Sequence, residues 1–197
     1  MTPPLLLACS PRPGGNTATM AAHVARGLRA AGGAMRLVFL RDTPVAPCTG
    51  CNACRDTGHC ILPDSPGVAA LHGLVCAAPA LLVFAPVYFY HVPAQLKAFI
   101  DRAQYLWQGM APTPQNATRP AWLGMVAGRA RGKELFNGSE RTLRCFLAVC
   151  GFHVQGSLFL RGYDDAGALA ADAAALERCR AFGMEAREYL AAHTGQT

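Results

Sequence analysis

Residues 5–17, LLLACSPRPGGNT, decide the fold, because an apolar run passes directly into a turn of proline, glycine and small polar side chains. The run at residues 5–9 is short and continuous, which is typical of a strand buried on both faces of a sheet. A helical pattern follows from Thr17 to Ala31, where Gly32 and Gly33 interrupt it. A buried strand, a loop and a helix in this order are the first unit of an α/β fold.

The same alternation continues along the chain. Apolar runs predict strands at residues 35–40, 80–85, 121–127 and 154–160, and helical patterns predict helices at residues 67–77, 93–107, 139–150 and 166–192. Such alternation predicts a parallel sheet with helices on both faces. We therefore expect residues 1–197 to form one flavodoxin-like, three-layer, doubly wound α/β domain, with five parallel strands in the order 2-1-3-4-5.

Two stretches interrupt the alternation. Residues 41–66 are rich in proline, glycine and cysteine and predict an irregular loop, and residues 109–120 predict a polar connection.

The loop after the first strand has the features of an anion site. In this strand order a ligand binds beyond the carboxyl ends of strands one and three. The loop leads into a helix N-terminus, where free N–H groups and the helix dipole favour negative charge. Ser10 and Thr17 add hydroxyls, Asn16 an amide and Arg12 a positive charge, a set that suits a terminal monophosphate. The alternative is a plain polar turn in which Asn16 or Thr17 caps the helix.

The loop after the third strand, PVYFYHVP at residues 86–93, places three aromatic side chains at a strand's carboxyl end. Aromatic side chains can cover the face of a flat ring such as a flavin, while backbone amides meet its polar edge. Consecutive aromatic residues also serve cores and subunit interfaces. His91 alone indicates no catalytic role.

Together the two loops resemble the NADPH-dependent FMN reductase family. The resemblance rests on SPRPGGNT at residues 10–17 and on APVYFYHVPAQLKAFIDR at residues 85–102, and it covers nearly the whole chain. It implies non-covalent FMN, NAD(P)H as co-substrate, and homodimers or homotetramers with the helix after Pro93 near the interface. The implied phosphate site is Ser10, Arg12, Asn16 and Thr17. The implied ring site is Pro86, Val87, Tyr88 and Phe89 on one side and Ala127, Gly128 and Arg129 on the other.

Four cysteines crowd into the irregular loop: Cys48, Cys51, Cys54 and Cys60. Two consecutive Cys-x-x-Cys intervals are the spacing that holds a cubic iron–sulfur cluster in ferredoxins, although Ile61, not proline, follows the last cysteine. The spacing also resembles the iron–sulfur flavoproteins, a branch of the same family that carries a 4Fe-4S cluster beside FMN. A redox-active thiol loop without metal and a structural zinc site remain alternatives.

Composition excludes several classes of protein. The net charge of the chain is +6. Its sixteen arginines and two lysines form no basic block in the sequence, so we expect no nucleic-acid partner. Proline at positions 79 and 86 interrupts the longest apolar stretch, so we expect no membrane span. Nine cysteines without a secretion signal predict reduced thiols and a cytoplasmic protein.

The five cysteines outside the irregular loop are expected at core positions: Cys9, Cys76, Cys145, Cys150 and Cys179. Asp101 and Arg102 are adjacent on a predicted helix and are expected to form a surface ion pair.

The sequence thus predicts an FMN-dependent oxidoreductase. It would take hydride from NAD(P)H and pass electrons to a flavin, a quinone, a nitro or azo compound, or an iron–sulfur centre. Because the cofactor carries this chemistry, no catalytic side chain is predicted. The alternatives are an electron carrier reduced by a protein partner such as ferredoxin, and a thiol or zinc regulatory protein without flavin.

Overall fold

The computed structural model describes residues 2–30, 32–108 and 119–193, and it confirms the predicted sheet. Five parallel strands lie in the order β2-β1-β3-β4-β5. They are β1 (Leu5–Ala8), β2 (Arg36–Phe39), β3 (Leu81–Pro86), β4 (Arg119–Ala127) and β5 (Phe152–Arg161). The carboxyl ends of β1 and β3 are neighbours, as the doubly wound order requires.

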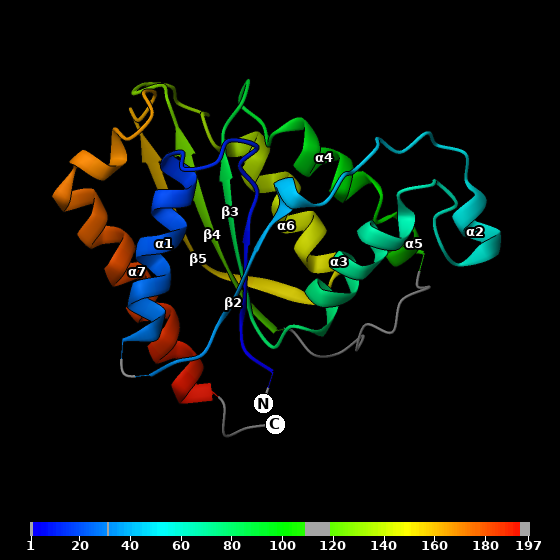
Figure 1. The fold of residues 1–197 in the computed structure, drawn as a ribbon, viewed down its shortest axis with the longest axis horizontal. Coiled ribbons are helices and arrows are strands. Elements are labelled where there is room, and N and C mark those ends of the chain that lie inside the picture. Colours follow the sequence, from blue (N-terminus) through cyan, green and yellow to red (C-terminus); the bar gives the residue numbers. More distant parts are fainter. Residues whose placement is uncertain (1, 31, 109–118, 194–197) are drawn as a thin grey trace.

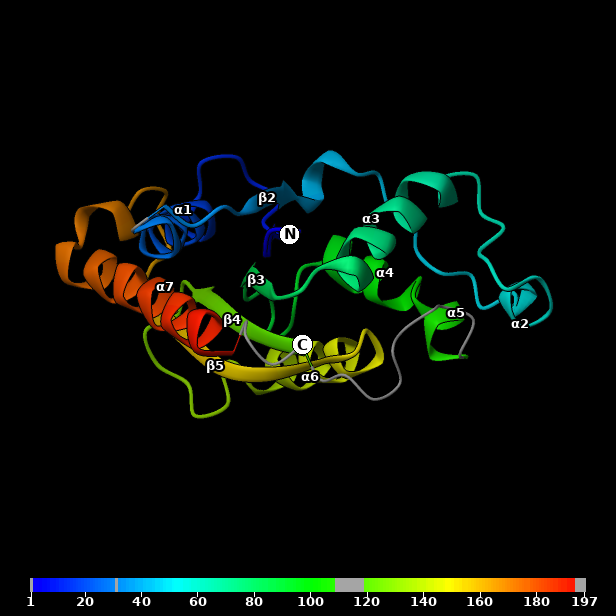
Figure 2. The same cartoon turned by 90° about the horizontal axis from the view of Figure 1, so that it is seen from below.

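Helices cover both faces of the sheet (Figures 1 and 2). One face carries α1 (Asn16–Arg29) and α7 (Ala173–His193). The other carries α3 (Ser65–Ala77), α4 (Ala94–Asp101) and α6 (Asn137–Val149). Two short helices, α2 (Ala53–Thr57) and α5 (Gln104–Trp107), lie beyond α3 and α4, away from the sheet. Among the residues that the structure describes, no helix combines the length and the apolar character that a membrane span requires.

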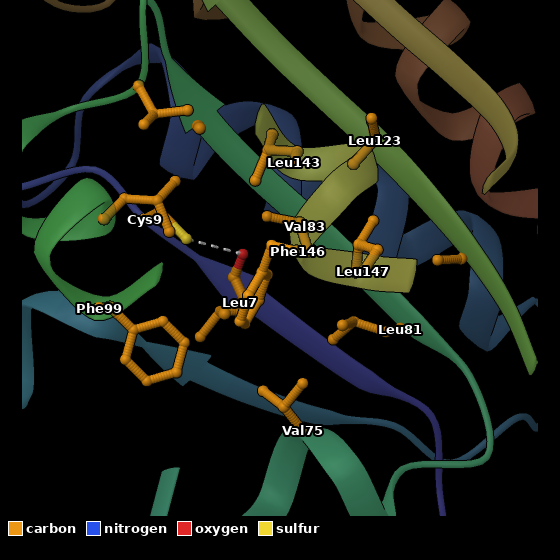
Figure 3. Packing of buried hydrophobic residues seen from close by; sticks show 14 of the residues in the cluster. Leu7, Cys9, Val75, Leu81, Val83, Phe99, Leu123, Leu143, Phe146 and Leu147 are labelled. Carbon is orange, nitrogen blue, oxygen red and sulfur yellow. Dashed lines mark hydrogen bonds between the residues drawn. The ribbon is translucent and has the colours of Figure 1, made fainter. Parts of the chain in front are cut away.

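Alternate residues of the central strands feed two separate cores. Leu5 and Leu7 of β1 face α3, α4 and α6, while Leu6 and Ala8 face α1 and α7. Figure 3 shows the first core, where Phe99 and Phe146 pack beside Leu7. The central strands are therefore apolar on both faces, as expected for a parallel sheet between two helical layers.

Helices α1 and α7 pack with their backbones in close contact. A Cβ atom added to Gly183 would lie 2.1 Å from the carbonyl oxygen of Val24, and one added to Gly27 would lie 2.1 Å from that of Arg180. Only glycine permits this approach. The contact fixes α7 against the helix that follows the loop after β1.

Several predicted boundaries were wrong. The helix predicted at residues 93–107 is two helices, because the Ala103 N–H donates to Ile100, three residues back, and ends the α-helical pattern. The helix predicted at residues 166–192 begins only at Ala173, where the Asp172 carboxylate accepts the Ala175 N–H as an N-cap.

Other boundaries also differ from the prediction. The loop at residues 41–66 contains α2 and a 3₁₀ turn, and β4 starts two residues earlier than predicted. Of the predicted connection at residues 109–120, residues 109–118 lie outside the described part, as does Ala31 at the predicted end of the first helix.

Candidate functional site

The loop after β1 and the start of α1 line a cavity of about 160 Å³ at the carboxyl edge of the sheet. Gly15 stands at the N-cap of α1 and brings no side chain to cap the first turn. Gly14 has a φ of 65°, a value that glycine adopts without strain, and it lets the loop turn back toward the helix. The uncapped N-terminus of α1 is a suitable place for an anion.

Ser10, Arg12 and Thr17 lie in the wall of this cavity. Ser10 is buried, and its Oγ accepts the Arg12 N–H at 3.2 Å, which fixes the loop. Thr17 is also buried, whereas Arg12 is exposed, and its guanidinium carbon lies 5.9 Å from the centre of the Tyr88 ring. One cationic side chain therefore spans the loops after β1 and β3.

Asn16 connects α1 to the segment after β5. Its Nδ2 donates to the carbonyl oxygens of Tyr163 and Asp165, each at 2.9 Å, and its Oδ1 accepts the Leu169 N–H at 3.1 Å. The side-chain amide is thus engaged within the protein. In this structure Asn16 positions the segment at residues 163–169, which forms another wall of the cavity.

A second cavity of about 370 Å³ adjoins the first and shares with it Val87, Tyr88, Gly128 and Asp164. Every predicted residue of the phosphate and ring sites lines one or both cavities: Ser10, Arg12, Asn16, Thr17, Pro86, Val87, Tyr88, Phe89, Ala127, Gly128 and Arg129. We call the two cavities together the flavin crevice. The role of these residues in binding FMN stays a prediction.

A tight turn at residues 88–91 forms the rim of the second cavity. The N–H of Tyr88 donates to His91 O at 2.8 Å, and the N–H of His91 donates back to Tyr88 O at 2.9 Å. Between them Phe89 and Tyr90 have φ angles of 49° and 62°, which is strained backbone for residues with side chains. The Phe89 side chain is fully exposed, whereas the Tyr90 hydroxyl accepts a hydrogen bond from Arg129 at 3.1 Å.

The sequence patterns did not indicate the wall contributed by the segment after β5. Tyr163, Asp164 and Ala166 all line the first cavity. Asp164 lies so close to Gly128 that a Cβ atom there would be 2.3 Å from the Asp164 Oδ1. The predicted topology could have indicated this wall, because the carboxyl end of β5 lies at the same edge of the sheet as those of β1 and β3.

The four cysteines Cys48, Cys51, Cys54 and Cys60 line a third cavity, of about 360 Å³, which we call the cysteine cavity. Gly50 and Gly58 both have positive φ angles, which glycine adopts without strain and which allow the loop to wind tightly. All nine cysteines are free thiols. Within residues 2–30, 32–108 and 119–193, no three Cys, His, Asp or Glu side chains are gathered closely enough to hold a single metal ion.

Outside this cavity the predicted core positions are only partly confirmed. Cys9, Cys150 and Cys179 are buried, but Cys76 is half-buried and Cys145 is exposed. Cys145 lies on α6 beside an exposed hollow. The helical pattern of the sequence does not show which face of such a helix packs against the core.

Arg102 corrects a prediction about the surface. Asp101 pairs with Lys97 at 2.6 Å, while Arg102 is buried and its guanidinium reaches Asp64 at 2.8 Å and the Cys60 sulfur at 3.1 Å. Although burial acts to raise it, hydrogen bonds from Leu62, Ser65 and Arg102 hold the pKa of the Cys60 thiol below its ordinary value. Burial likewise opposes ionisation of Asp64, yet the Ala46 N–H and Arg102 hold its pKa low.

The model of the NADPH-dependent FMN reductase family matches residues 4–163, a span that includes both loops of the flavin crevice and the cysteine loop. The chain belongs to this family. The resemblance inferred from the two sequence motifs is therefore confirmed.

Curated relatives include iron–sulfur flavoproteins. The one from Methanosarcina thermophila is 42% identical over 69 residues, which are 35% of each chain. The one from Archaeoglobus fulgidus is 34% identical over 137 residues, which are 70% of this chain and 60% of the relative. The chain thus matches between about a third and three fifths of the length of these relatives.

Solved structures share the fold at low sequence identity. An NADH:FMN oxidoreductase in its apo form has a TM-score of 0.64 and 18% identity, over 96% of this chain and 90% of the other. An NAD(P)H:quinone oxidoreductase from Methanothermobacter marburgensis has a TM-score of 0.67 and 18% identity, over 94% and 96%. An azoreductase from Bacillus anthracis has a TM-score of 0.67 and 14% identity, over 94% and 100%. These likenesses support the doubly wound fold.

Proposed function

We propose that this protein is an FMN-dependent oxidoreductase. It would take hydride from NAD(P)H and pass electrons to a flavin, a quinone, a nitro or azo compound, or an iron–sulfur centre. The observation that carries the proposal is the flavin crevice, in which an uncapped helix N-terminus and a wider, partly aromatic cavity share one wall. Family membership supports it.

The residues present fit a phosphorylated flavin. The smaller cavity offers the α1 N-terminus, the Ser10 hydroxyl and the Arg12 charge to a phosphate. The larger cavity offers Val87, Tyr88 and Phe89 to a flat ring. When bound, FMN supplies a centre that accepts hydride as two electrons and can release them singly. The protein's own part is to bind, orient and shield that centre.

We propose that the cysteine cavity holds a 4Fe-4S cluster on Cys48, Cys51, Cys54 and Cys60. The cavity walls fit such a group, because four cysteines with free thiols line one cavity, and N–H groups of Gly50 and Arg102 donate to the sulfurs of Cys48 and Cys60. A cluster separates its ligating sulfurs more widely than a single ion does. Iron, sulfide and zinc analysis of anaerobically purified protein separates the cluster from zinc and from a metal-free thiol loop.

A binding titration tests the flavin site. Arg12→Gln removes the one cationic side chain among the predicted phosphate ligands, and a hydrogen bond to a charged group contributes about 1.5–3 kcal/mol. We therefore expect FMN affinity to fall by about tenfold or more, with the thermal unfolding temperature unchanged. The matched control is Arg144→Gln on α6, which breaks only an exposed pair with Glu140. Equal affinity in wild type and Arg12→Gln would refute the assignment.

Anaerobic mixing with NADPH or NADH tests the reaction. Rapid bleaching of the flavin absorption is the result expected of the oxidoreductase. The cysteine cavity favours a second candidate, an electron carrier that a protein such as ferredoxin reduces. No bleaching by either nucleotide, together with reduction by ferredoxin, would favour the carrier. A protein that binds no FMN would overturn both.

We also propose a cytoplasmic homodimer or homotetramer. The nine free thiols suit a reducing compartment. Trp107, 72% exposed at a partly apolar hollow between α4, α5 and α6, suits an interface with a second copy.

A further inference from the structure

We propose that Arg102 is the positioning residue of the cysteine cavity, closing its loop and donating a hydrogen bond to the Cys60 sulfur that stabilises the reduced cluster. This inference rests on the cluster proposed above. The sequence had predicted that Arg102 forms a surface ion pair.

The contacts of Arg102 join both ends of the cysteine loop. Its Nε donates to the Cys60 Sγ at 3.1 Å, and one terminal nitrogen donates to Ala46 O at 3.0 Å and to the Asp64 carboxylate at 2.8 and 3.0 Å. The other terminal nitrogen donates to the Ser65 Oγ at 2.8 Å. Ala46 precedes the first of the four cysteines and Asp64 follows the last, so one side chain ties the loop at both ends.

A buried guanidinium is costly unless its donors are satisfied and its charge is paired. Arg102 meets both conditions, since its side chain is fully buried while its partners come from four different residues. Its planar fork allows these directed hydrogen bonds, which the point charge of a lysine cannot reproduce. The residue is therefore suited to fixing geometry as well as charge.

The hydrogen bond to Cys60 has an electrostatic consequence. A cluster on four thiolates gains negative charge when it is reduced, and hydrogen bonds to its sulfurs stabilise that state. Arg102 acts on the sulfur through both its directed N–H group and its positive charge, and Asp64 partly offsets that charge. Loss of this donor should lower the reduction potential, while loss of Asp64 should not.

The position of Arg102 also limits its motion. It follows α4, an eight-residue helix about 12 Å long that begins directly after the flavin-crevice loop. Phe99 of the same helix is buried in the core, which anchors the helix. The donor thus stands on a packed element, whereas Cys60 lies on a loop.

The experiment compares Arg102→Gln, Asp64→Asn and the control Arg144→Gln in anaerobically reconstituted full-length protein. Three quantities are measured: iron and sulfide per chain, the midpoint potential of the cluster, and the rate at which trypsin cleaves the apo protein at Arg55. Arg55 is exposed in the cysteine loop, so its cleavage reports on how firmly that loop is held. Arg102→Gln should shift the one-electron reduction equilibrium by roughly tenfold, ~59 mV toward lower potential. Asp64→Asn should leave the potential unchanged or raise it. Cleavage at Arg55 should be faster in both and unchanged in the control.

The opposite responses separate positioning from a merely structural role. An unchanged potential in Arg102→Gln, or the same lowered potential in both variants, would overturn the inference alone. If Arg102→Gln loses the cluster but still binds FMN, the loop-closing role is supported. The reduction potential is then measured in Arg102→Lys, where it should be lower than in wild type. If wild-type protein takes up no iron, the cluster and this inference both fall, and the flavin proposal stands on its own titration.

Discussion

The flavin crevice and the cysteine cavity are built in different ways. The loops of the crevice end strands of the sheet and begin helices, so the sheet hydrogen bonds and two apolar cores fix their positions. The loop that carries the four cysteines, with α2, lies beyond α3 and α4, away from the sheet (Figure 1), and it carries no strand. Its ends are instead held by the buried guanidinium of Arg102. Topology sets the first site, and a side-chain network sets the second.

Because different interactions hold the two sites, a perturbation can be aimed at one and spare the other. FMN affinity reports on the crevice, and tryptic cleavage at Arg55 reports on the cysteine loop. Local stability in proteins varies in this way between packed elements and loops.

The largest expected effect comes from Gly183→Ala, which acts on the crevice. The new Cβ would meet the Val24 backbone oxygen at 2.1 Å, so α1 and α7 must separate. Overpacking of this kind costs about 3 kcal/mol or more, and each kcal/mol lowers the unfolding temperature of a chain this size by roughly 2–4 °C. Because α1 begins at the predicted phosphate site, FMN affinity should fall as well. Calorimetry and FMN titration measure the two effects.

The control for this variant is Gly73→Ala on α3. No atom lies within 4 Å of the added Cβ, and alanine in a helix is favoured over glycine by about 0.5–1 kcal/mol. We expect unchanged or slightly raised stability and unchanged FMN affinity. Faster cleavage at Arg55 in Gly183→Ala would show that the two sites are not separable.

The second effect is a loss of stability in acid, on the side of the cysteine cavity. His72 is buried, with Nε2 at 3.0 Å from Phe99 O and Nδ1 at 3.1 Å from the Tyr105 hydroxyl, so it joins α3 to α4 and α5. Burial lowers the pKa of His72 to about 4 from an ordinary 6.5. Between these values the unfolded chain binds more protons, so stability is full above about pH 6.5 and falls as pH drops toward 4, by about 2–3 kcal/mol.

Denaturant unfolding at pH 5 and pH 8 measures this difference. His72→Gln should reduce it, because an amide does not titrate, whereas His153→Gln, at an exposed position, should leave it unchanged. Acid should also speed cleavage at Arg55 before it weakens FMN binding. A full acid effect in His72→Gln would contradict the assignment.

The sequence predicted the crevice better than the cysteine cavity, for a physical reason. In a parallel sheet the carboxyl ends of all strands lie at one edge. The sequence alone therefore predicted that Ser10 and Tyr88, which are distant in the chain, lie close together. Asp164 follows from the same rule applied to β5. Arg102 does not, because its partners lie 37 to 56 residues away in a loop without periodicity. The cysteine spacing indicated one shared cavity, but nothing in it indicated which side chain closes the loop.

The smallest effect sharpens the comparison at a single backbone position, Phe89. A residue with a side chain at a φ of 49° costs about 1 kcal/mol or more relative to asparagine or glycine, and the exposed Phe89 ring recovers none of this by burial. Phe89→Asn should therefore stabilise the flavin-free protein by about 1 kcal/mol while weakening FMN binding. Ile61→Asn is the matched control, because Ile61 is an exposed apolar residue of the cysteine cavity without a positive φ. It should change neither quantity. Phe89→Leu keeps the strained backbone and removes the ring, so it should lose FMN affinity without gaining stability. A more stable Phe89→Leu protein would show that the exposed ring, and not the backbone conformation, destabilises the wild type.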